Sequence, residues 1–243
     1  MSITEGGQPS ICAVIPAFNE SGNIGGVIAD IRSHDRGNCI VVVDDGSSDA
    51  TAEIAQALGV TVLRLPVNLG IGGAVQTGLK YAAANGFDTA FQFDGDGQHL
   101  AGELPNLLAP VLGGSADVAI GSRFRSGRSE YRCSFTRRIG IRVISQITSL
   151  LIGQRITDPT SGFRAYNRRA LEFLANEYPQ DYPEPEAIIA LSRNGFSIQE
   201  VPVAMKARAE GKSSIGALGA CYYMTKVLLA ILVASIRTHT AEA

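Results

Sequence analysis

The sequence has no tryptophan, only three histidines and only four cysteines among its 243 residues. The cysteines are scattered and include no Cys-x-x-Cys pair, a usage that favours a reducing, cytosolic setting. Cys12 and Cys39 lie inside apolar, strand-like runs, so we expect both to be small core residues.

Neither sign of charge dominates the chain. The 21 Lys and Arg residues stand against 23 Asp and Glu residues, a balance that argues against a nucleic-acid partner. Residues 1–10 are polar and contain no apolar segment, so we expect a flexible N-terminus without a signal peptide. With 45% hydrophobic residues and no internal repeat or low-complexity linker, residues 11–214 are predicted to form one domain with a full core.

Short apolar runs alternate with helical patterns through the first half of the chain. Such continuous apolar strands are typical of a mostly parallel, Rossmann-like α/β sheet with helices on both faces. The predicted strands are 11–15, 39–43, 60–65, 87–93, 117–121 and 196–203. The predicted helices are 23–33, 50–58, 70–85, 104–112, 135–152, 168–175 and one that opens at 181–186 and runs through 193.

Polar residues follow several of these strands directly. In a parallel sheet the carboxyl ends of the strands meet at one edge, and ligands bind there. We therefore expect one site to gather Pro16, Asp44, Asp45, Asp94, Asp96 and Arg123.

The segment Asp94-Gly95-Asp96-Gly97-Gln98-His99 carries two carboxylates one residue apart, with glycines that allow a close backbone approach. Two carboxylates and the Gln98 carbonyl are hard oxygen ligands, which suit Mg²⁺ or Mn²⁺ held partly by substrate phosphates. Taken alone, the segment fits a polar turn equally well. We interpret His99 as a structural or supporting residue.

Four motifs occur together and in a fixed order. They are Val14-Ile15-Pro16-Ala17-Phe18-Asn19-Glu20, Val43-Asp44-Asp45-Gly46-Ser47-Ser48-Asp49, Asp94-Gly95-Asp96-Gly97-Gln98-His99 and Thr157-Asp158-Pro159-Thr160-Ser161-Gly162-Phe163-Arg164. From about residue 11 to residue 212 the sequence resembles the family 2 glycosyltransferases of GT-A fold. Within them it is similar to dolichol-phosphate mannose synthase and related polyprenyl-phosphate glycosyltransferases.

The resemblance implies a catalytic set of Asp94, Asp96 and Arg123, with a divalent metal at Asp94, Asp96 and Gln98. It implies that the nucleotide-sugar donor is bound by Pro16, Ala17, Phe18, Glu20, Asp45, Asp94, Arg208 and Lys212. It places the phosphate of a polyprenyl-phosphate acceptor at Arg123 and Arg137. The synthases often carry Asp-Ala-Asp-Leu-Gln-His, and Gly95 and Gly97 of this chain could alter the fit of the sugar.

A phosphate acceptor is already anionic, so orienting arginines matter more than a strong base. With no nucleophile motif in view, we expect inversion at the anomeric carbon. A saccharide hydroxyl is the alternative acceptor and would need a base, for which Asp94, His99 and Glu186 are candidates. A non-catalytic nucleotide-sugar-binding subunit is a further alternative, and the sequence does not choose between UDP and GDP donors.

Several polar residues have simpler interpretations. Asp44 and Asp49 are expected to build a turn, with Asp49 as N-cap of helix 50–58. Arg138 and Arg142 are expected to be solvated or lipid-facing. The Gly70-Ile71-Gly72-Gly73 cluster follows the third strand instead of the first, which argues against a dinucleotide fingerprint.

Residues 215–243 are predicted to form a C-terminal apolar helix and tail. The run 217–236 reaches the roughly 20 residues of a membrane span, but Lys226 near its middle argues against a stable one. We favour peripheral contact with the inner, cytoplasmic membrane face. A membrane-protein partner or a homo-oligomer interface are the alternatives.

Overall fold

The computed structural model describes residues 9–34, 39–125, 135–180 and 182–206, and only the backbone of residues 135–137. The strands are β1 (Ile11–Ala17), β2 (Cys39–Asp44), β3 (Thr61–Arg64), β4 (Thr89–Gln92), β5 (Val118–Ser122), β6 (Arg164–Asn167) and β7 (Ile198–Pro202). The helices are α1 (Ile24–His34), α2 (Thr51–Ala57), α3 (Gly70–Ala84), α4 (Leu104–Leu112), α5 (Phe135–Ile152), α6 (Arg168–Glu177) and α7 (Pro183–Arg193), with a 3₁₀ turn at Ala101–Glu103.

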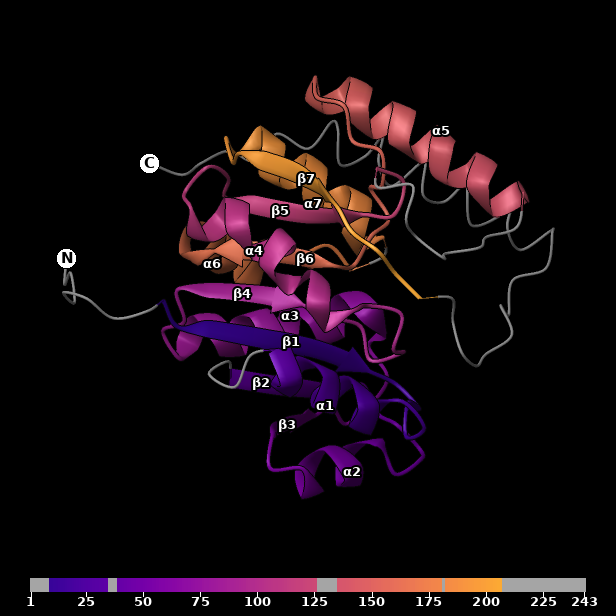
Figure 1. The fold of residues 1–243 in the computed structure, drawn as a ribbon, viewed down its shortest axis with the longest axis vertical. Helices are drawn as coiled ribbons and strands as arrows, with labels where there is room; N and C mark the ends of the chain where they lie inside the picture. Colours follow the sequence, from indigo (N-terminus) through magenta and orange to yellow (C-terminus); the bar gives the residue numbers. More distant parts are fainter. Residues whose placement is uncertain (1–8, 35–38, 126–134, 181, 207–243) are drawn as a thin grey trace.

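The strands form one seven-stranded sheet in the order β3-β2-β1-β4-β6-β5-β7 (Figure 1). Every neighbouring pair is parallel except those of β6, which runs antiparallel to both β4 and β5. The prediction of a mostly parallel sheet is confirmed. The sequence did not predict β6 as a strand, because its four residues follow directly on a turn-rich motif.

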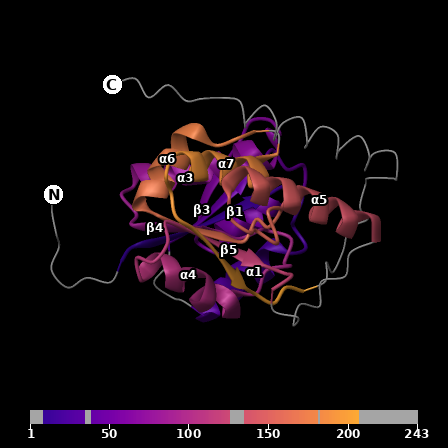
Figure 2. The same ribbon diagram turned by 90° about the horizontal axis from the view of Figure 1, so that it is seen from above.

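Helices cover both faces of the sheet, as predicted (Figure 2). Alternate residues of β1 pack into the cores on the two faces of the sheet. Ala13 and Ile15 belong to the core under α1 and α4, whereas Cys12 and Val14 belong to the core under α3, α6 and α7. Side chains in a strand point alternately to opposite faces, so a strand that is buried on both sides reads as one apolar run. Cys12 is a buried core residue, and Cys39 is partly buried against the same core.

Helix α5 stands apart from these two layers. It packs on α7 through Ile144 and Ile189, and both views show it projecting past the rest of the described fold (Figures 1 and 2). No helix in the described ranges is long and apolar enough to cross a membrane. The apolar run 217–236, with Arg208 and Lys212, lies outside the described residues.

Candidate active site

A pocket of about 400 Å³ lies at the carboxyl ends of β1, β2 and β4. It brings together every predicted nucleotide-binding and metal-binding residue of the described chain except Gln98. Its lining comprises Pro16, Ala17, Phe18, Glu20, Asp45, Asn68, Gly70, Ile71, Ala74, Asp94, Gly95 and Asp96. Four of these residues are acidic, so the pocket suits a metal-bound ligand better than a free anion.

Asp45 connects the second strand with the start of α3. Its two carboxylate oxygens accept hydrogen bonds from the backbone amides of Leu69 at 2.7 Å and Gly70 at 2.9 Å. Burial raises the pKa of Asp45, and these two hydrogen bonds oppose the rise. The turn is tight, because a Cβ on Gly46 would lie 2.9 Å from the backbone nitrogen of Asn68. Asp45 thus shapes the pocket wall from a fixed position.

Asp44 and Asp49 build the surrounding turn, although one detail of the prediction is wrong. Asp44 accepts a hydrogen bond from the amide of Ser47 at 3.3 Å. The N-cap of α2 is Ala50 and not Asp49, and Ala50 makes no side-chain capping bond. Asp49 instead accepts from the amides of Thr51 at 3.0 Å and Ser21 at 3.1 Å. It therefore joins the loop after β1 to the loop after β2.

Asp94 is held from two sides. Gln92 Nε2 donates to Asp94 Oδ1 at 3.1 Å, and the backbone amide of Asp94 donates to Nδ1 of His99 at 3.0 Å. Burial lowers the pKa of His99, which keeps the ring neutral with its proton on Nε2, 3.5 Å from Asp94 Oδ2. The ring stacks on Phe163 with a centroid distance of 4.7 Å and meets Phe93 edge-on at 5.2 Å. His99 is therefore a positioning residue for Asp94, in line with its predicted supporting role.

Asp96 is oriented by Gln98, whose amide nitrogen and side-chain Nε2 donate to its two carboxylate oxygens at 3.1 and 2.7 Å. In the described part of the chain no three His, Cys, Asp or Glu side chains are grouped to hold a metal ion by themselves. Two carboxylates at a pocket wall nevertheless fit Mg²⁺ or Mn²⁺, because these ions commonly take their remaining ligands from substrate phosphates and water. Asp94 and Asp96 would hold such an ion, and Gln98 as a third ligand stays a prediction.

Arg123 follows β5 and forms a buried ion pair that the sequence did not predict. Its Nε and Nη2 donate to the two carboxylate oxygens of Asp158 at 2.7 and 2.6 Å, and Nη2 also contacts Thr160 at 2.9 Å. Asp158 is held in turn, because its amide donates to Glu200 on β7 at 2.7 Å. The Arg123 guanidinium is thus fixed in orientation and already neutralised.

The Thr157–Arg164 motif also supports Asp94. A Cβ on Gly162 would lie 2.8 Å from Gln92 Nε2 and 2.9 Å from Asp94 Oδ2, so only glycine fits there without displacement.

Arg164 is fully buried and donates to the carbonyls of Ser161 and Pro159. Burial raises the pKa of Glu184 near Arg164, although Arg164 opposes the rise. Glu184 has no local signal in the sequence, whereas Asp158 and Gly162 are visible there as parts of the motif.

The remaining predicted residues are only partly described. Arg137 lies in α5, but its side chain is outside the described structure. Of the three candidate bases for a hydroxyl acceptor, Asp94 lines the pocket, whereas His99 is buried and faces Asp94, and Glu186 accepts from the amide of Tyr182 at 3.1 Å.

Comparison with known proteins identifies the family of this chain. The sequence profile described as "Glycosyl transferase family 2" matches residues 12–174. The chain belongs to glycosyl transferase family 2. It is therefore a glycosyltransferase.

The names of two relatives of this glycosyltransferase specify lipid phosphates as substrates or products. The UDP-N-acetylglucosamine--dolichyl-phosphate N-acetylglucosaminyltransferase of Methanococcus voltae is 34% identical over 212 residues, spanning 79% of this chain and 84% of the relative. The polyprenol monophosphomannose synthase of Mycolicibacterium smegmatis is 31% identical over 211 residues, spanning 83% of this chain and 79% of the relative.

The solved structures agree on the fold. Glucosyl-3-phosphoglycerate synthase from Mycobacterium tuberculosis, in complex with Mn²⁺ and UDP-glucose, superposes with a TM-score of 0.69 at 25% identity. The match covers 96% of this chain and 81% of that one. This glycosyltransferase therefore has the predicted GT-A fold.

Proposed function

We propose that this glycosyltransferase moves a sugar from a UDP- or GDP-sugar to a polyprenyl phosphate, with Mg²⁺ or Mn²⁺ as cofactor and inversion at the anomeric carbon. We place the reaction at the cytoplasmic face of the membrane. The observation that carries the proposal is the pocket where Glu20, Asp45, Asp94 and Asp96 meet, in a chain whose named relatives use lipid-phosphate acceptors.

On the donor side, Phe18 is 46% exposed beside the pocket and offers an apolar ring to a nucleoside base. Pro16, Ala17, Glu20 and Asp45 form the wall that would surround the base and ribose. Asp94 and Asp96 would hold the metal ion against the diphosphate. When bound, the ion would stabilise the negative charge that grows on the leaving nucleoside diphosphate. Arg208 and Lys212 are proposed to contact the same diphosphate.

On the acceptor side, the chain has to orient an anion and does not have to deprotonate an alcohol. A phosphate monoester can attack the anomeric carbon without a strong general base. Of the three candidate bases for transfer to a saccharide hydroxyl, only Asp94 is among the residues that line the pocket, and the proposal gives Asp94 to the metal ion instead. Arg123, fixed by Asp158, and Arg137 are proposed to lie beside the acceptor phosphate.

The proposal is tested by supplying the full chain with UDP- and GDP-sugars, Mn²⁺ or Mg²⁺, and either a short prenyl phosphate or a glycan acceptor. Release of nucleoside diphosphate should require both the metal and the prenyl phosphate. Release that depends only on the glycan would favour the saccharide reaction. A retained anomer in the product would contradict direct displacement.

A further inference from the structure

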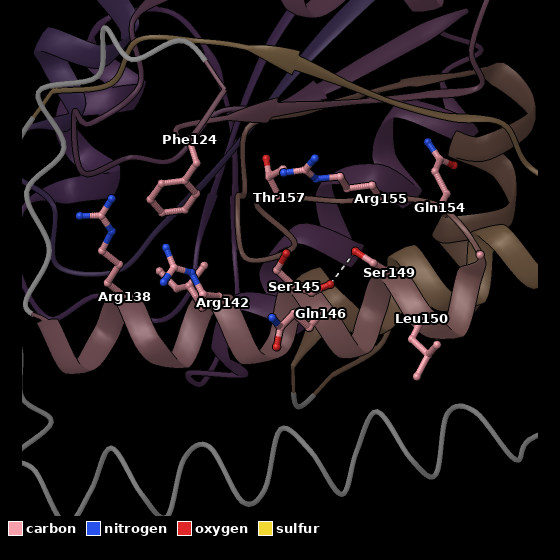
Figure 3. A pocket seen from close by; sticks show the side chains of 12 residues that line it. Phe124, Arg138, Arg142, Ser145, Gln146, Ser149, Leu150, Gln154, Arg155 and Thr157 are labelled. Carbon is pink, nitrogen blue, oxygen red and sulfur yellow. Dashed lines mark hydrogen bonds between the residues drawn. The ribbon is translucent and has the colours of Figure 1, made fainter.

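A second cavity, of about 850 Å³, lies between α5 and the segment 153–157 that follows it. Figure 3 shows Arg138 and Arg142 rising from α5 on the side that faces Phe124, while Arg155 reaches over the same space from the opposite wall. We call this cavity the α5 groove. Its volume falls within the range of small-molecule sites.

The walls of the α5 groove are fastened to each other. Ser145 Oγ donates to the carbonyl of Ile156 at 2.5 Å, and the amide of Ile156 donates to Ser149 Oγ at 2.9 Å. The segment is also tied to β7, because Gln154 Nε2 donates to the carbonyl of Ile198 at 2.8 Å. Arg155 is thus carried by a segment that is fixed on both sides. These hydrogen bonds hold the two walls of the groove in place.

The charge of the α5 groove points to an anion. Arg138, Arg142 and Arg155 are exposed, and none of the three has an ion-pair partner within the described ranges. No acidic side chain is among the described residues that line the groove. The donor pocket has the opposite character, with four carboxylates in its wall. Unpaired arginines in a concave site are suited to phosphate, which their planar guanidinium groups bind through paired hydrogen bonds.

The groove is also partly apolar. Phe124 and Ile141 line it, and Leu150 at its rim is 82% exposed. Ile139 and Leu151 are further exposed apolar residues of α5. A free phosphate or a sugar phosphate gains nothing from such a surface, whereas an amphiphile with a phosphate head does.

The groove adjoins the candidate active site. Phe124 and Thr157 line it, and they directly follow Arg123 and precede Asp158 in the chain. Thr157 Oγ1 also lies 2.8 Å from the Ser122 hydroxyl at the end of β5. An anion in the groove would therefore lie beside the ion pair of Arg123 and Asp158.

We infer that the α5 groove binds the phosphate head and first isoprene units of the lipid acceptor, with Arg142 and Arg155 as phosphate ligands and Phe124 and Ile141 against the chain. This inference rests on the proposed function for the identity of the acceptor. It assigns recognition to arginines whose charge is unpaired, beside an Arg123 that Asp158 already neutralises.

A binding experiment tests the groove without requiring turnover. The chain has no tryptophan, so Phe124→Trp introduces a single tryptophan in the groove wall, whose emission can be excited apart from that of the seven tyrosines. Titration with farnesyl phosphate should change its emission, whereas farnesol and inorganic phosphate should act only at much higher concentration. Arg142→Ala and Arg155→Ala should each weaken farnesyl phosphate binding on the order of tenfold. Equal responses to inorganic phosphate, or no effect of either substitution, would overturn the inference.

Steady-state kinetics on proteins that keep Phe124 provide the second test. Arg142→Ala and Arg155→Ala should raise the KM for the prenyl phosphate on the order of tenfold and leave the donor KM unchanged. Arg32→Ala, an exposed arginine in the last turn of α1, is the matched control and should change neither. If the wild type transfers to prenyl phosphate and the groove variants keep its KM, the groove inference fails alone. If the wild type transfers to no lipid phosphate, the proposed function fails.

Discussion

The guanidinium of Arg123 and the carboxylate of Asp158 form a buried two-point ion pair, with N···O distances of 2.7 and 2.6 Å. Asp158 is fully buried, and the Arg123 side chain is only 8% exposed. Removing one member of a buried pair leaves the other charged and unpaired. Asp158→Ala should therefore lower the free energy of unfolding by about 3–5 kcal/mol, measured by urea denaturation.

An exposed pair serves as the control for this prediction. Arg64 Nη2 lies 2.6 Å from Glu53 Oε1, but both side chains are about half exposed. Glu53→Ala should lower the free energy of unfolding far less than Asp158→Ala does, because an exposed ion pair is screened by solvent. If Asp158→Ala cost no more than Glu53→Ala, the Arg123–Asp158 pair would not have the structural role assigned to it.

His99 should affect metal use through Asp94, whose position it helps to hold. His99→Ala removes the acceptor for the Asp94 amide, and loss of a supporting residue of this kind typically costs 10–100-fold in metal affinity or activity. We expect the Mn²⁺ concentration for half-maximal activity to rise by about that factor. Phe93→Leu disturbs the same aromatic cluster without a hydrogen bond to Asp94, and should reduce stability with little change in the Mn²⁺ requirement. Equal Mn²⁺ requirements in the two variants would contradict the positioning role.

Gly162 should tolerate no side chain. An added Cβ would meet Gln92 Nε2 and both Asp94 carboxylate oxygens at 2.8–3.0 Å, so Gly162→Ala should displace Asp94. We expect kcat to fall at least about tenfold, as for other small displacements of catalytic groups. Gly26→Ala in α1, where an added Cβ meets nothing within 4 Å, should leave kcat unchanged. A normal kcat in Gly162→Ala would show that Asp94 does not need its present position.

Asp49 should contribute stability in a defined range of pH. Burial opposes ionisation, but the hydrogen bonds from Thr51 and Ser21 together outweigh it and lower the pKa of Asp49 from 3.8 to about 2. A carboxyl group whose pKa is lower in the folded than in the unfolded protein stabilises the fold at pH values above its unfolded pKa. This contribution disappears as the pH falls through the folded pKa. Asp49→Asn should therefore have a lower Tm than the wild type at pH 7. The difference in Tm between the two proteins should narrow between pH 4 and pH 2. A Tm difference that stays constant over this range would contradict the lowered pKa of Asp49.

Much of the fold was predictable because buried parallel strands have a strong local signature. The apolar runs at 11–15 and 39–43 correspond to β1 and β2, and the polar residues after them meet in one pocket as expected. Strand β6 was not predictable in this way. Its residues Arg164 and Tyr166 are polar or amphipathic, and their burial depends on β4 and β5, which lie far away in the sequence.

The site shows the same division. Asp94 and Asp96 were identified from their spacing and their position after a strand. The pairing of Arg123 with Asp158 was not, because 35 residues separate the two and neither sequence segment requires the other. The α5 groove was also hidden, since Arg142 and Arg155 approach each other only when α5 and the following segment are tied together. Local patterns predict elements and motifs, whereas partners across the fold need the three-dimensional structure.

Transfer of labelled sugar from a nucleotide donor to a short prenyl phosphate tests the central claim most directly. The wild type and Asp96→Asn should be assayed side by side with Mn²⁺ or Mg²⁺, and the lipid product isolated and its anomer determined. We predict a metal-dependent prenyl-phosphate sugar of inverted configuration from the wild type, and at least about a 100-fold lower rate from Asp96→Asn. Label that appears only as free sugar, or equal rates for the two proteins, would contradict the account.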